Sequence, residues 1–128
     1  MINKIHAYLS KRPNIVIYAI LLLTTLTLAL TLLPVDKVMP SKLWTYDKLG
    51  HLGIFGGWTF LVGYYRYLLD PESINLLVIF VIGVAFGVAV EFLQYMMPLN
   101  RTADLFDIAF DALGCFIATL ALYKITER

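Results

Sequence analysis

Acidic side chains recur at regular spacing in the last apolar stretch of this 128-residue chain. Asp104, Asp107 and Asp111 stand three and four residues apart, which places them on one face of an α-helix. Glu91 and Gln94 form a similar stripe in the preceding apolar stretch. A carboxylate near the middle of a bilayer costs about 2.5–3.5 kcal/mol on insertion scales, so these side chains must face protein or a water-filled cavity. We therefore expect both stripes to point inward and to share one pocket.

Further polar residues are expected at the same end of the folded chain. Asp47, Lys48 and His51 begin the second apolar stretch, and Arg101 precedes the fourth. If all of these residues share a pocket, its carboxylates exceed its two cationic side chains by three negative charges. Carboxylates that are crowded in a medium of low dielectric bind protons or cations. We therefore expect bound protons, a divalent metal ion or the cationic group of a ligand in this pocket.

The donor atoms of the pocket indicate which metal it would hold. Carboxylate oxygens favour Mg²⁺, Ca²⁺ or Mn²⁺, whereas one histidine is too few for a dedicated zinc site. The candidate metal ligands are Glu91, Asp104, Asp107 and Asp111.

The same residues are candidates for catalysis and for substrate binding. The sequence shows no Ser-His or Cys-His arrangement, and Cys115 lies within an apolar stretch, so only metal-assisted or carboxylate-assisted chemistry is open. The sequence leaves open whether the protein is an enzyme. The candidate catalytic residues are Glu91, Asp107, Asp111 and His51, and the candidate substrate-binding residues are Arg101, Lys48, Gln94 and Asp47.

Several of these residues also have a purely structural interpretation. Asp104 stands near the start of a predicted helix, where an acid complements the helix dipole. Lys48 can extend to the lipid headgroups, and Gln94 can hydrogen-bond a neighbouring helix. Arg101 either neutralises nearby acids or binds a lipid phosphate through its planar guanidinium group. Asp107 and Asp111 lie too deep in their helix for a role at the helix end, which favours function or obligatory ion binding.

The composition predicts which elements must position these residues. Hydrophobic residues make up 60% of the chain and charged residues 15%, whereas soluble domains are roughly a quarter charged. Four apolar stretches consume most of the length, so we predict a single all-α domain, a bundle of four transmembrane helices. We also predict a short interfacial helix before them, and caps at Asp47 and Thr102. The domain covers 1–128, and its transmembrane helices cover about 14–33, 47–69, 74–97 and 102–123.

The basic residues predict how the bundle is oriented. With four spans, six Lys and Arg residues lie on the side of both termini and four on the opposite side. Because positive residues accumulate on the cytoplasmic side, we expect a multi-pass cell-membrane protein with both termini in the cytoplasm and the polar pocket facing outward. The basic residues are scattered, which argues against nucleic acid as a partner. The expected partners are membrane lipids, and oligomerisation is left open.

Taken in order, the polar residues resemble the signature of VanZ-like membrane proteins. The matching parts are Asp47-Lys48 with His51, Glu91 with Gln94, Arg101, and Asp107 in Asp-x-x-x-Asp-x-Leu-Gly, and the resemblance covers roughly residues 47–118. Two positions depart from the pattern, since Asp111 stands where asparagine is usual and Ala118 where a second glycine is common. The additional carboxylate at Asp111 can alter the metal preference of the pocket.

This resemblance implies a bacterial cell-envelope setting, because the family takes its name from a protein associated with low-level resistance to the glycopeptide teicoplanin. We therefore expect the pocket to bind or modify an amphipathic or lipid-linked cell-envelope substrate, or a glycopeptide, with a link to teicoplanin resistance. Two other classes stay open. One is proton or cation translocation, for which intramembrane carboxylates are a usual sign, and the other is a non-catalytic structural membrane subunit.

Overall fold

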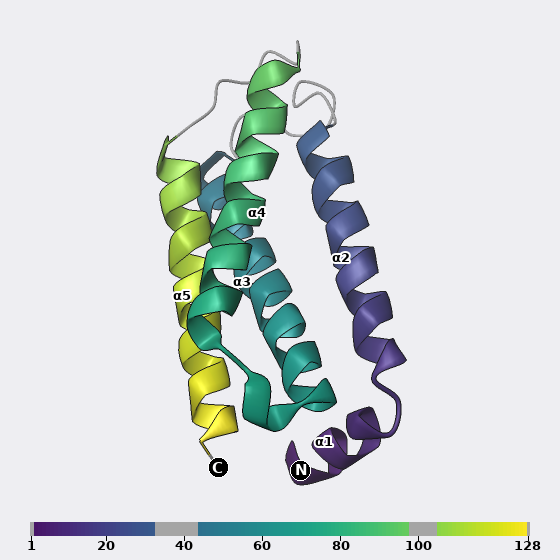
Figure 1. The fold of residues 1–128 in the computed structure, drawn as a ribbon. Helices are drawn as coiled ribbons and strands as arrows, with labels where there is room; N and C mark the ends of the chain where they lie inside the picture. Colours follow the sequence, from purple (N-terminus) through teal and green to yellow (C-terminus); the bar gives the residue numbers. More distant parts are fainter. Residues whose placement is uncertain (1, 33–43, 98–104, 128) are drawn as a thin grey trace.

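The computed structural model describes residues 2–32, 44–97 and 105–127, and almost all of these residues are helical. The helices are α1 (Ile2–Ser10), α2 (Asn14–Leu32), α3 (Trp44–Leu69), the 3₁₀ helix η3 (Pro71–Ser73), α4 (Leu76–Met96) and α5 (Leu105–Thr126). No strand occurs within these ranges. Figure 1 shows α2, α3, α4 and α5 running alternately in opposite directions, with α1 and the last turn of α5 at the same end of the bundle. The predicted all-α class is confirmed.

The helix starts differ from the predicted ones at two places. α3 begins at Trp44, so Asp47 lies inside the helix, and the prediction that Asp47 caps its start is wrong. α4 begins at Leu76, because the chain first forms η3 and because Asn75 is the capping residue. The side chain of Asn75 accepts a hydrogen bond from the backbone N–H of Val78 at 3.2 Å, which satisfies one of the unpaired donors at the helix start. The predicted cap at Thr102 lies outside the described residues.

The predicted short N-terminal helix is present as α1, and it lies across the end of the bundle. The helical segments 4–10 and 14–30 meet at 90°. His6 on α1 hydrogen-bonds through Nδ1 with the hydroxyl of Tyr64 on α3 at 3.1 Å, and its ring lies 5.5 Å from that of Tyr67. These contacts hold α1 against the C-terminal part of α3 (Figure 1).

α3 is the central helix, which packs against α2, α4 and α5. Glycines bring the backbones of α3 and α5 into contact. A Cβ added to Gly56 would lie 2.9 Å from the carbonyl oxygen of Gly114, and a Cβ added to Gly114 would overlap the carbonyl oxygen of Leu52. Further along α3, Gly63 leaves the space that the side chain of Leu122 occupies. Small residues at these positions allow the close approach of the two helix backbones.

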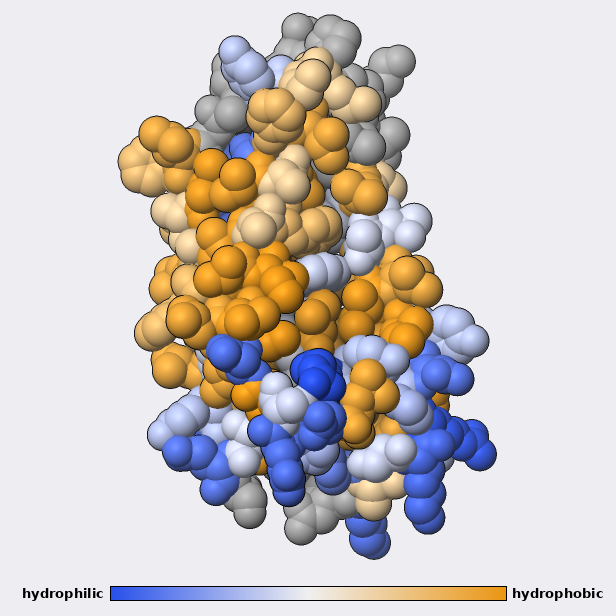
Figure 2. Space-filling model, viewed as in Figure 1, coloured by the Kyte–Doolittle hydropathy of each residue, from blue (hydrophilic) through white to orange (hydrophobic). Residues whose placement is uncertain are grey.

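The outer surface of the bundle is largely apolar. α4 and α5 are each long and apolar enough to cross a membrane, and α1 with α2 adds a third candidate if that bent pair counts as one span. Figure 2 shows apolar residues over the middle of the visible face and hydrophilic residues near the end that carries α1. By this criterion two or three spans are present in the described residues, where the sequence predicted four. α3 differs because it carries glycines, tyrosines and charged residues, and its central position surrounds it with other helices.

Candidate metal centre

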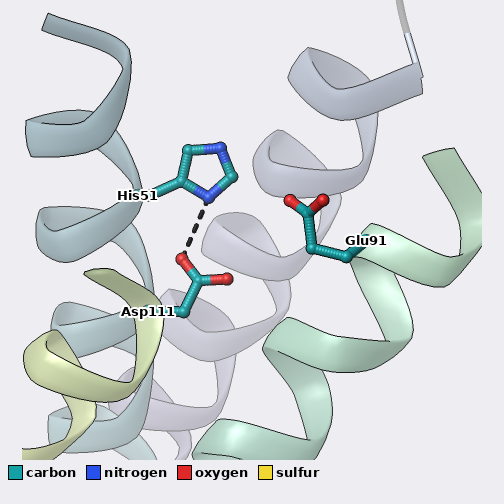
Figure 3. Close-up of side chains that lie close together, drawn as sticks. All are labelled: His51, Glu91 and Asp111. Carbon is teal, nitrogen blue, oxygen red and sulfur yellow. Dashed lines mark hydrogen bonds and ion pairs between the residues drawn. The ribbon is translucent and has the colours of Figure 1, made fainter. Parts of the chain in front are cut away.

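Three buried side chains from three different helices converge near one end of the bundle. His51 comes from α3, Glu91 from α4 and Asp111 from α5, and their exposed fractions are only 8%, 2% and 1%. Each offers one ligand atom, and these atoms all lie within 4.8 Å of one another. Figure 3 shows the side chains extending from their helices toward a common space. One imidazole and two carboxylates at this spacing form a donor set that can hold a divalent cation.

A hydrogen bond connects two of the three side chains. Nδ1 of His51 lies 2.9 Å from Oδ1 of Asp111, and an ionised Asp111 accepts a hydrogen bond from the ring N–H at this distance. The other oxygen, Oδ2 of Asp111, is buried and has no hydrogen-bond partner among the described residues. Figure 3 shows this oxygen on the side of Asp111 that faces Glu91. A buried carboxylate oxygen without a partner is costly, so a cation or a proton bound at this atom would be favourable.

Close packing of the helices positions the cluster. The contact between Gly56 and Gly114 lies about one helical turn from His51 and Asp111, so it determines how far apart these two side chains stand. On α4, Gly87 faces Asp111, and a Cβ at that position would lie 2.8 Å from Oδ2 of Asp111. The ring of Phe55 stacks on the imidazole of His51 at a centroid distance of 5.8 Å. The glycines therefore leave room for the carboxylate, while Phe55 restrains the ring.

The bundle core becomes apolar beyond the cluster, toward the end that carries α1. The first layer is still polar, since the hydroxyl of Thr59 donates to Sγ of Cys115 at 3.1 Å. Sγ of Cys115 in turn lies 3.9 Å from the carbonyl oxygen of Phe55. Further on, the buried side chains of Ile79 and Leu122 fill the space beside α3. The cluster is thus closed on this side by hydrocarbon.

Lys48 lies on the opposite side of the cluster, nearer the start of α3. It is half-buried, and it precedes His51 by three residues on the same helix face. Its Nζ lies 4.5 Å from the ring centroid of Phe106 and 6.0 Å from that of Phe110, both on α5. Phe110 directly precedes Asp111 in the sequence. A cationic side chain therefore stands about one helical turn from the three candidate ligands, on the side where α3 begins.

The structure brings together some of the residues that the sequence singled out. Glu91, Asp111 and His51 meet, and Gln94 is buried on the same face of α4 as Glu91. Asp107, although expected among the ligands, is half-buried and does not belong to the group within 4.8 Å. The expected inward orientation therefore holds for Glu91, Gln94 and Asp111.

Three further candidates cannot be placed in the site. Arg101 and Asp104 lie outside the described residues, as does the side chain of Asp47.

The aromatic rings around the cluster were not predicted. Phe106 and Phe110 are four residues apart, and so are His51 and Phe55, which places each pair on one helix face. The four-residue spacing is visible in the sequence, and it indicates that the two residues of each pair are neighbours on the helix surface.

The fold and the site together define an all-helical protein with helices of membrane-spanning length and a buried His-Glu-Asp cluster between three of them. Comparisons with protein-family models, with curated proteins and with solved structures found no match to this chain.

Proposed function

We propose that this chain is a multi-pass membrane protein whose His51, Glu91 and Asp111 bind a divalent cation, and that this centre binds or modifies a lipid-linked cell-envelope substrate. The observation that carries the proposal is the convergence of three buried ligand atoms, one from each of α3, α4 and α5, within 4.8 Å of one another. Buried ionisable residues in a membrane protein are expensive, which makes such a cluster a functional site by default. The cell-envelope setting and the link to teicoplanin resistance rest on the resemblance to VanZ-like proteins alone.

Mn²⁺ is the cation that we expect this centre to bind best. Mg²⁺, Ca²⁺ and Mn²⁺ all accept carboxylate oxygens, but Mn²⁺ combines these with the imidazole nitrogen of His51 more readily than the other two ions. Glu91 and Asp111 supply two negative charges, which balance the charge of one divalent ion. The remaining coordination positions would be left to water or to a substrate oxygen, which is how a metal ion polarises the group it acts on.

The proposal includes four membrane spans, formed by α2, α3, α4 and α5. The alternating directions of these helices support it (Figure 1). With the end that carries α1 in the cytoplasm, six basic residues lie on the cytoplasmic side and four on the other. The cluster then lies in the outer half of the bundle, where an amphipathic substrate of the outer leaflet can approach it.

Metal titration of the purified protein tests the centre directly. In neutral detergent, after removal of metals by a chelator, we expect the protein to bind one Mn²⁺ per chain, with Mg²⁺ and Ca²⁺ competing more weakly. Binding should also raise the thermal unfolding midpoint, since a ligand at 100 times its dissociation constant contributes about 2.7 kcal/mol to stability. A metal-free protein that binds none of the three ions at millimolar concentration would contradict the proposal.

Ion translocation is the alternative function, and the structure of the core argues against it. Beyond Thr59 and Cys115, the described core is filled by Ile79 and Leu122, which offer no hydrogen-bonding groups to a proton or cation. We expect liposomes that contain the protein to show no H⁺, Na⁺ or K⁺ flux above that of empty liposomes. A flux that the substitution Glu91→Gln abolishes would instead support translocation.

A further inference from the structure

We infer that the substrate of this centre carries a phosphate group, which binds between the cation and Lys48. This inference rests on the proposed function, because it requires a cation on His51, Glu91 and Asp111. It goes further in naming the chemical class of the ligand, a phosphate ester of an amphipathic molecule.

The position of Lys48 is the first argument. Lys48 and His51 are three residues apart on α3, so the ammonium group stands on the same face of the helix, about one turn nearer its start. The cluster below is almost completely buried, whereas Lys48 is half-buried. A ligand that reaches the cluster from the start of α3 therefore meets the ammonium group first.

Aromatic contacts keep the ammonium group at this position. Nζ of Lys48 lies over the ring of Phe106 at 4.5 Å and within 6.0 Å of the ring centroid of Phe110. Both distances allow a cation–π attraction. This attraction favours a Lys48 side chain that extends from α3 to the rings on α5 over one that rotates freely into the headgroup region. An ammonium group held between two helices can donate hydrogen bonds to an anion without first being ordered.

The charges of the site favour an anion only when a cation is bound. Without a metal, Glu91 and Asp111 carry two negative charges, and Asp107 one turn above adds another, so a phosphate is repelled. A divalent cation neutralises the two buried carboxylates and offers open coordination positions to phosphate oxygens, and the ammonium group of Lys48 adds a positive charge on the other side of the phosphate. We therefore expect phosphate binding to depend on the metal.

The surface beside Lys48 indicates that the phosphate belongs to an amphipathic molecule. At the start of α5, Leu105 and Phe106 are 82% and 66% exposed, on the same end of the helix as the contact with Lys48. A phosphate that carries an acyl or prenyl chain can lay that chain along this apolar surface, as membrane lipids do, whereas a free phosphate ion cannot.

Binding of dodecyl phosphate to the metal-loaded protein tests the inference. In neutral detergent with Mn²⁺, we expect dodecyl phosphate to bind, to change the electron paramagnetic resonance spectrum of bound Mn²⁺, and to bind more tightly than inorganic phosphate. Lys48→Gln should weaken this binding about tenfold or more, as expected for loss of a charge-assisted hydrogen bond, while Mn²⁺ still binds. Lys124→Gln, an exposed lysine near the end of α5, is the matched control and should change nothing.

Each contrary result has a distinct meaning. Binding of Mn²⁺ without binding of dodecyl phosphate, or equal binding by the Lys48→Gln variant, overturns the inference and leaves the cation site intact. Inorganic phosphate that binds as tightly as dodecyl phosphate overturns the amphipathic ligand. Absence of Mn²⁺ binding in the unsubstituted protein overturns the proposed function and this inference together.

Discussion

Replacement of Asp111 by asparagine is expected to lower the affinity of the protein for Mn²⁺ by about 100-fold or more, since even residues that only orient metal ligands contribute about 10–100-fold. Asparagine has nearly the same shape as aspartate, and its carbonyl oxygen can still accept the hydrogen bond from Nδ1 of His51. The variant therefore loses one negative charge and the buried Oδ2, which has no partner among the described residues, but not the packing of α5 against α3. The measurement is the free Mn²⁺ signal in an electron paramagnetic resonance titration of the purified protein.

Two controls separate loss of the metal from loss of the fold. The metal-free Asp111→Asn protein should unfold at a temperature no lower than the unsubstituted protein, because the substitution removes a negative charge next to Glu91 from a buried site. Asp70→Asn removes a half-exposed carboxylate from the turn that follows the other end of α3, and it should leave Mn²⁺ affinity unchanged. If Asp111→Asn binds Mn²⁺ as tightly as the unsubstituted protein, Asp111 is not a ligand and the proposed centre is wrong.

Gly114→Ala is expected to destabilise the bundle and weaken the metal centre at the same time. The added methyl group would overlap the carbonyl oxygen of Leu52 and press on the backbone of Gly56, neither of which can rotate away. Overpacking of this kind typically costs about 1–3 kcal/mol. α3 and α5 must then move apart about one turn from His51 and Asp111, so the ligands separate. We expect a lower thermal unfolding midpoint and a weaker affinity for Mn²⁺.

Gly53→Ala provides the matched control for this prediction. Gly53 is also helical, but it is exposed, and a Cβ added there would meet no atom within 4 Å. Alanine has a higher helix propensity than glycine, by up to about 1 kcal/mol, so this variant should be as stable as the unsubstituted protein or slightly more stable. Equal effects of Gly114→Ala and Gly53→Ala on the unfolding midpoint would show that the contact between Gly56 and Gly114 does not determine the packing of α3 and α5.

The sequence alone was enough to predict the helices and, for α4 and α5, the side of the helix that faces inward. Long apolar stretches and the polar breaks between them predicted α2, α3, α4 and α5, because the backbone must hydrogen-bond internally where water is excluded. The stripe formed by Glu91 and Gln94, and the depth of Asp111 in its apolar stretch, predicted their burial because carboxylates and amides are excluded from lipid. The predicted starts of the helices were less accurate. The start of α4, for example, depends on the hydrogen bond that the side chain of Asn75 accepts from the backbone N–H of Val78.

Only the tertiary structure decided which of the aligned acids form the cluster. Asp107 and Asp111 lie on the same face of α5, and helical periodicity treats them alike. The level at which α5 meets α3 is determined by the backbone contact between Gly56 and Gly114, and it places Asp111 opposite His51 while Asp107 stands one turn away. The distance between side chains on different helices depends on the height and separation at which those helices cross. Those two quantities follow from the close packing of glycines far apart in the chain, which spacing along a single helix does not specify.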